Sequence, residues 1–170
     1  MKKQARDPHA PPPTAPKGTV AATRVIMTEV VLPKDTNKYG SVFGGRVMEL
    51  LDICGYLAAV RHYRGNLVTA SVDHLSFLHP VKLGHIMILH GQVNAAFRHS
   101  MEVGVKVFSE NPETGEKRHV VSAYLTFAAL DELGRPAAVA PLRLEAADEK
   151  RRNKDAVRRR EHRLAERAKS

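Results

Sequence analysis

One carboxylate in this chain of 170 residues stands where a charge is costly. Asp52 lies near the middle of residues 46–60, which would be apolar on nearly every side of a helix. A buried carboxylate is strongly destabilising unless it is paired, hydrogen-bonded or neutralised. Such a group can activate water or attack a carbonyl itself, and it can equally be half of a structural ion pair. Asp52 is therefore the first candidate for chemistry.

A glycine pair, Gly44 and Gly45, comes directly before this apolar segment. The first N–H groups of a helix lack partners inside the helix and can donate to developing negative charge, although the pair could equally serve close packing of helix and sheet. At about 1.5 Å per residue, Gly45 lies roughly 10 Å from Asp52 along a helix axis. One reacting carbonyl cannot touch both in one subunit. A two-fold dimer with antiparallel helices would bring Asp52 of one subunit near Gly45 of the other.

Other residues offer less to a chemical argument. Asn37 belongs to the Asn- and Gly-rich stretch 37–45 and is, by type, a turn residue. Glu49 is expected at a rim or on the surface. Nine histidines and the single Cys54 show none of the spacings of metal ligands, so we expect no metal site. Walker, Gly-x-Gly-x-x-Gly and Gly-x-Ser-x-Gly motifs are absent, which leaves nucleotide hydrolysis, dinucleotide binding and a serine nucleophile without support.

The elements that must position these residues follow the order strand, helix, sheet. The helix is predicted from the glycine pair to about His62, after a loop at residues 33–45. Gly91, inside a predicted strand, indicates a bulge or a close approach of two backbones. A helix that is apolar all round can be wrapped by a curved antiparallel sheet, so we expect an α+β fold. The predicted strands are residues 20–32, 67–77, 85–95, 100–109 and 118–130.

The two ends of the chain differ from the domain predicted at residues 20–143. Residues 1–19 are rich in proline and are predicted to be a disordered or polyproline-like arm. Residues 144–170 are predicted to be a charged, solvated helical tail, supported by pairs of Asp148 with Arg152 and Asp155 with Arg159. Because this tail has little apolar surface, we expect its removal to leave catalysis largely intact.

Charge and apolar patterning exclude several classes of partner. Of the net charge of +9, residues 1–19 carry +3 and residues 144–170 carry +4, so the basicity lies mostly at the ends and we predict no nucleic-acid partner. No apolar run is long enough to cross a membrane, and no apolar segment follows Lys2 and Lys3, so neither a membrane partner nor a secretory signal is expected. The lone cysteine excludes a disulfide framework, which fits a cytoplasmic protein.

Several blocks of sequence, taken in order, resemble one known family. Asp35-Thr-Asn37-x-x-Gly40-x-x-x-Gly44-Gly45-x-x-Met48-x-x-x-Asp52 resembles the signature of the hotdog-fold acyl-CoA thioesterases. The resemblance is to the branch of the bacterial broad-specificity short-chain and animal cytosolic acyl-CoA hydrolases, and it spans about residues 25–141. The blocks that agree with it further along the chain are residues 68–73, 77–81, 100–105 and 127–131.

The resemblance implies a hotdog fold, in which a curved antiparallel β-sheet wraps one long central helix. It also implies homodimers, assembled as trimers of dimers, that hydrolyse acyl-CoA thioesters to free CoA and a carboxylate. Neither a metal nor a separate cofactor is implied, since coenzyme A is part of the substrate. By this resemblance Asp52 is the general base or nucleophile, the Gly45 N–H polarises the thioester carbonyl, and Asn37 positions water or the thioester. Expected contacts to coenzyme A are Arg98, Ser100 and Thr69.

The chain departs from the family pattern in places, and two alternative functions stay open. Phe43 stands where many members have His, and Gly84-His85 replaces a frequent Gly-Asp.

A hotdog dehydratase acting on acyl-carrier protein would pair a His with the helix carboxylate, and no His precedes Gly44 in the loop. A non-catalytic acyl-CoA-binding or regulatory protein would not need both Asn37 and Asp52.

Overall fold

The computed structural model describes residues 17–73 and 75–169, which form one antiparallel sheet of five strands with two long helices. The predicted α+β class is confirmed. The strand order is β1-β3-β4-β5-β2, so β1 and β2 are the edges. Most of the predicted proline-rich arm lies outside the described residues. The strands are β1 (Val25–Val30), β2 (Asn66–Val72), β3 (Ile86–Ala96), β4 (Ser100–Glu110) and β5 (Lys117–Leu130).

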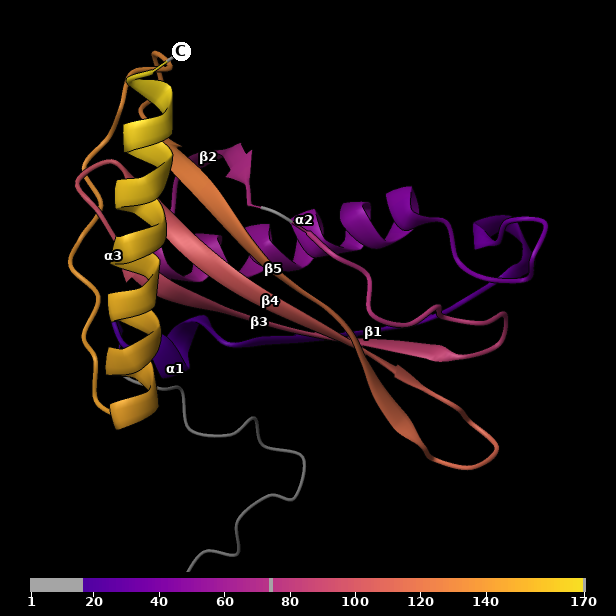
Figure 1. The fold of residues 1–170 in the computed structure, drawn as a ribbon. Coiled ribbons are helices and arrows are strands. Elements are labelled where there is room, and N and C mark those ends of the chain that lie inside the picture. The colour runs from indigo at the N-terminus through magenta and orange to yellow at the C-terminus, as the bar shows by residue number, and fades with distance from the viewer. Residues whose placement is uncertain (1–16, 74, 170) are drawn as a thin grey trace, which may run out of the picture.

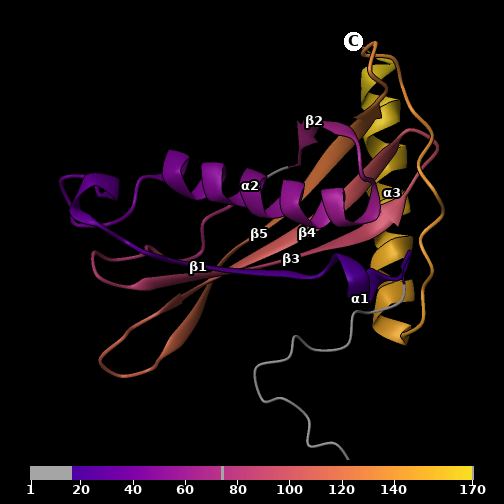
Figure 2. The same ribbon diagram turned by 180° about the vertical axis from the view of Figure 1, so that it is seen from behind.

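The sheet lies between the two long helices (Figures 1 and 2). The helix α2 (Gly44–His62) runs along one face, and α3 (Ala147–Arg167) crosses the other. Strand residues alternate between the two faces, so Val103 of β4 belongs to the buried apolar core while its neighbour Glu102 meets α3. Among the described residues, no helix combines the length and apolar content that a membrane crossing requires.

The helix α2 begins at the glycine pair and ends at His62, as predicted. The prediction that all its faces are buried is wrong for the single chain, because one sheet covers only one side of a helix. Asp52 lies at the border and is half-buried, whereas Met48 and Tyr56 are 50% and 42% exposed. The buried side chains on the sheet side of α2 are Val47, Leu50, Leu51, Cys54, Ala58 and Ala59.

Glycine permits the close contact of α2 with the sheet. A Cβ atom at Gly91 would lie 2.9 Å from the Cys54 sulfur and 3.2 Å from the Cys54 carbonyl oxygen. The predicted close approach at Gly91 is thus confirmed, and the irregularity of β3 falls further on, between Val93 and Ala95. Burial at this contact raises the pKa of the Cys54 thiol to about 11.

The first predicted strand begins later than expected. Residues 20–23 form the short helix α1 (Val20–Thr23), and β1 begins at Val25. Two threonine hydroxyls favour the helical turn: Thr19 Oγ1 accepts a helix N–H at 3.3 Å, and Thr23 Oγ1 donates to the Val20 carbonyl at 2.7 Å. Side-chain-to-backbone bonds of this kind compete with strand pairing.

The strand predicted over residues 67–77 ends at Val72. The Asp73 N–H still donates to the Tyr124 carbonyl at 2.9 Å, and the Asp73 carboxylate is held by Arg163 of α3. Among the described residues beyond it, the Leu78 N–H again donates to β5, at the Val120 carbonyl. The strand thus ends where a helix from the far end of the chain makes contact, which local patterning could not predict. His74 lies outside the described residues.

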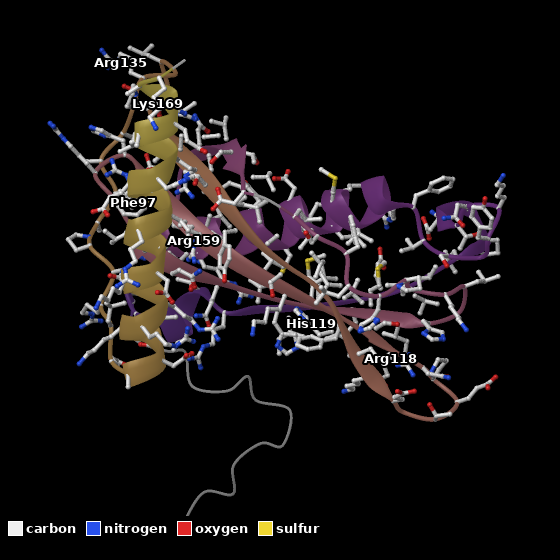
Figure 3. All side chains as sticks on the ribbon, in the orientation of Figure 1. Phe97, Arg118, His119, Arg135, Arg159 and Lys169 are labelled. Atoms are coloured by element: carbon white, nitrogen blue, oxygen red, sulfur yellow. The ribbon has the colours of Figure 1, made fainter. Side chains whose placement is uncertain are left out.

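The C-terminal tail forms the predicted helix, and the prediction that this helix is solvated holds for one side only, because the other side packs on the sheet. In α3, Ala156 and Glu149 are buried against the body of the protein. The pair of Asp148 with Arg152 is confirmed at 2.7 Å. The predicted pair of Asp155 with Arg159 does not form, because Arg159 points from α3 to the sheet, where it meets the buried Glu102 at 2.7 Å (Figure 3).

Candidate active site

Asp52 is held by a hydroxyl from the neighbouring edge strand. Thr69 of β2 donates its Oγ1–H to Asp52 Oδ1 at 2.6 Å, the length expected of a charge-assisted bond from a hydroxyl to a carboxylate. Both side chains line a pocket of about 410 Å³. In the described part of the chain no other group donates to this carboxylate. One oxygen of the carboxylate therefore has a hydroxyl donor, and the described residues supply no donor to the other.

Gly45 lines the same pocket as Asp52. Residues that lie seven apart share one face of a helix, which explains how one pocket contains both. The axial distance of roughly 10 Å between them nevertheless remains. Phe43, the residue before the helix, provides no side-chain cap, and its carbonyl accepts from Arg46 and Val47. The Gly45 N–H is thus one of the first-turn donors that a ligand can use.

Asn37 lies in a different pocket of the same chain. Its Oδ1 accepts from the backbone N–H groups of Tyr39 at 2.9 Å and Ser41 at 3.3 Å, so its turn role is observed. The pocket that it lines has a volume of about 280 Å³ and also includes Gly44. Within one chain the structure therefore brings Gly45, but not Asn37, together with Asp52.

Arg46 fixes the loop that carries Asn37 to the start of α2, and sequence reasoning missed it. Its guanidinium contacts Glu29 at 2.9 Å, Glu49 at 2.8 Å and Asp35 at 3.5 Å. The hydrogen bond to Glu49 is the main reason that the pKa of Arg46 is raised. Glu49 itself is exposed, as predicted. The sequence does contain a sign of this role, because Arg46 is a cation directly after the glycine pair in an otherwise apolar segment.

The three residues expected to contact coenzyme A are dispersed. Thr69 lies beside Asp52, whereas Ser100 lines a pocket of about 260 Å³ that also contains Arg160 and Arg167 of α3. Arg98 is exposed in the turn between β3 and β4, where its carbonyl accepts from the Val139 N–H at 3.0 Å. Their contacts to coenzyme A stay a prediction.

A curled antiparallel sheet against one long helix is a hotdog-type fold, and a carboxylate at their border is a group that a hydrolase can use. Residues 39–116 match the family model of the Thioesterase superfamily. The chain is 39% identical over 117 residues to the "Uncharacterized acyl-CoA thioester hydrolase YkhA" of Bacillus subtilis, which covers 69% of this chain and 68% of that protein. The chain therefore belongs to the acyl-CoA thioester hydrolases of the thioesterase superfamily.

Solved structures share the fold and confirm the predicted hotdog architecture. An acyl-CoA hydrolase from Bacillus cereus matches with a TM-score of 0.85 and 36% identity, covering 91% of this chain and 94% of that one. A hexameric acyl-CoA thioesterase matches with a TM-score of 0.84 and 38% identity, covering 88% and 96%. The Staphylococcus aureus acyl-CoA hydrolase, solved with butyryl coenzyme A and coenzyme A, matches with a TM-score of 0.83 and 32% identity, covering 91% and 94%.

Variants of the Staphylococcus aureus hydrolase have also been solved. In separate variants an asparagine, an aspartate and a threonine are replaced by alanine. Those three positions follow one another in the same order and at the same spacing as Asn37, Asp52 and Thr69.

Proposed function

We propose that this chain hydrolyses acyl-CoA thioesters to free coenzyme A and a carboxylate, with Asp52 as the reacting carboxylate. The observation that carries the proposal is the Thr69–Asp52 bond of 2.6 Å, in a pocket that also presents Gly45. The butyryl coenzyme A bound to the Staphylococcus aureus relative supports the substrate class. The variants of that relative support the choice of residues.

Asp52 can act by either of two routes. As a general base it takes a proton from water, whose oxygen bonds to the thioester carbon before the C–S bond breaks and the thiolate leaves with a proton. As a nucleophile its own oxygen attacks, the thiolate leaves, and water hydrolyses the acyl anhydride. In both routes the carbonyl oxygen becomes negative. The Gly45 N–H, at the positive end of α2, supplies the electrostatic stabilisation that is usually the largest contribution.

We also propose that each site is shared between two subunits. Gly45 and Asp52 are too far apart along α2 for one carbonyl, and Asn37 lines a different pocket of the same chain. Antiparallel pairing of two α2 helices would set Asp52 of one subunit beside Gly45 and Asn37 of the other. The exposed Met48 and Tyr56 on the free side of α2 support such pairing. The hexameric relative supports a trimer of dimers.

Further features of the proposal come from the sequence. Arg98 and Ser100 remain our candidates for binding coenzyme A phosphates, and neither a metal nor a separate cofactor takes part. A cytoplasmic location stays a prediction. A dehydratase is disfavoured because such an enzyme pairs a His with the helix carboxylate, and the sequence has no His in the loop before Gly44.

Release of free thiol from acyl-CoA esters of increasing chain length tests the proposal. We expect at least one ester to yield thiol and free acid in equal amounts, with turnover. The chain's own thiol adds little background, because Cys54 is buried and its pKa is raised to about 11. Binding of acyl-CoA without any thiol release across the series would instead support the non-catalytic alternative.

A further inference from the structure

Arg163 of α3 forms an ion pair with the end of the strand that carries Thr69. Its Nη1 donates to both oxygens of the Asp73 carboxylate, at 2.9 and 2.7 Å. The two side chains are only 18% and 16% exposed. Charge-assisted bonds are stronger than neutral ones, and screening by solvent is weaker where both partners are mostly covered. This pair can therefore fix the position of a backbone segment.

Asp73 follows directly after β2, the strand that most needs such a restraint. β2 is a sheet edge, and its pairing with β5 shifts register between Thr69 and Ser71. Edge strands lack a ladder on one side, and an irregularity interrupts the other. Beyond the ladder, the Asp73 N–H bond to the Tyr124 carbonyl and the ion pair with Arg163 hold the residue that follows β2.

β2 carries the group that orients the reacting carboxylate. Thr69 donates to Asp52 at 2.6 Å, and Val72 lines the same pocket one residue before Asp73. We propose that Arg163 is a positioning residue for Asp52, which acts by fixing β2 so that the Thr69 hydroxyl meets the carboxylate. This inference rests on the proposed function, in which Asp52 reacts. It gives the C-terminal helix a part in catalysis without any contact to substrate.

A purely structural role for Arg163 is the rival explanation, because Arg163 also lies 3.6 Å from the buried Glu102. A variant of Asp73, the other member of the ion pair, separates the two roles. Asp73→Asn removes the charge that Arg163 holds on β2, yet it leaves Arg163 and Arg159 in place for Glu102. A positioning role requires Asp73→Asn and Arg163→Ala to affect turnover alike.

The experiment measures kcat, KM and melting temperature for Arg163→Ala and Asp73→Asn, each in the wild-type and in the Thr69→Ala background. We expect each to lower kcat by about tenfold with a smaller change in KM, since small misplacements of reacting groups are costly. In the Thr69→Ala background the further loss should be under about twofold, because coupled residues are not additive. Arg163→Lys should restore part of kcat.

Arg158→Ala is the matched control, since Arg158 is on the same helix and its side chain is 67% exposed; it should leave kcat unchanged. Equal fold-losses of kcat in both backgrounds, or a lowered melting temperature with full kcat, would overturn the inference and leave Arg163 a structural residue. If Arg163→Ala does not fold, Asp73→Asn decides. Wild-type kcat in Asp52→Asn would instead overturn the proposed function itself.

Discussion

Asp52 and Thr69 meet across two elements, a helix and an edge strand. The sequence pointed to Asp52 because a carboxylate in an apolar segment is conspicuous. It did not reveal the bond to Thr69, since the pairing depends on how β2 lies beside α2. The expectation of full burial was wrong as well: Asp52 is half-buried, so its environment combines an apolar flank with access to the pocket.

Removal of the Thr69 hydroxyl tests what this bond contributes. A hydrogen bond to a charged group is worth about 1.5–3 kcal/mol, so Thr69→Ala should lower kcat by roughly ten- to a hundredfold if the bond orients Asp52. Thr69→Ser, which keeps the hydroxyl, is the control and should stay near wild type. Steady-state kinetics on one acyl-CoA measures both. Equal kcat in Thr69→Ala and Thr69→Ser would show that the hydroxyl has no such role.

At the scale of elements, local patterning predicted the bounds of α2 and the central strands well. These elements are predicted by a glycine pair before an apolar segment and by alternation in the strands. Both patterns involve only residues that are close together in the sequence. The places that differ, such as α1, the end of β2 and the docking of α3, depend on contacts between distant residues. Arg159 could not be matched to Glu102 from sequence, because the partners lie on different elements.

The packing of α3 on the sheet also changes the effect that we expect from removing this helix. Glu102 is fully buried in β4, where Asn94 donates to it, and its charged partners are two arginines of this helix. Arg163 in addition holds Asp73 at the end of β2. The expectation that removal of residues 144–170 leaves catalysis largely intact therefore does not fit these contacts. Their removal would leave a buried carboxylate without a counter-charge, which is strongly destabilising.

A single substitution measures the contribution of the Arg159–Glu102 pair to stability more directly than truncation of the chain does. Arg159→Ala should lower the free energy of unfolding by about 2–3 kcal/mol, below the roughly 3–5 of a fully broken buried pair because Arg163 remains close to Glu102. Chemical denaturation gives the value. Arg151→Ala is the control, since Arg151 makes exposed pairs with Asp148 and Asp155 whose loss costs little. If the two variants are equally stable, α3 does not anchor the sheet through Glu102.

For the whole molecule, the single chain leaves a large apolar area exposed where α2 and β2 meet. Apolar areas of this kind on soluble proteins indicate interaction sites. Because Met48 and Val72 of this area line the pocket of Asp52, self-association would cover the site and the helix together. The residues concerned, each between 37% and 50% exposed, are Met48, Ile53, Tyr56, Leu57 and Val72.

Light scattering should therefore give a mass several times the 18.8 kDa of one chain, at least that of a dimer. Val68→Lys places a charge on the exposed edge strand β2 and should lower the mass, because lysine blocks edge-to-edge pairing. Leu133→Lys is the control: Leu133 is 75% exposed in a loop. An active monomer, or unchanged mass in Val68→Lys, would contradict an interface along β2.

Mixed assemblies test whether a site takes residues from two subunits. Asn37→Ala and Asp52→Ala chains, each inactive alone, should regain about half of wild-type activity in verified mixed dimers, because one of the two symmetric sites is then intact. Two affinity tags isolate the mixed species. No recovery in such dimers would place Asn37 and Asp52 in the same subunit's site.

The central claim is that Asp52 carries out thioester hydrolysis, and turnover of one good acyl-CoA substrate by Asp52→Asn tests it most directly. Loss of a general base costs roughly 10²–10⁴ in rate. The account predicts a kcat lowered by that factor, with unchanged oligomeric mass and melting temperature, because the amide keeps the size of the carboxylate and can still accept from Thr69. Turnover close to wild type in the purified, correctly assembled variant would contradict the account.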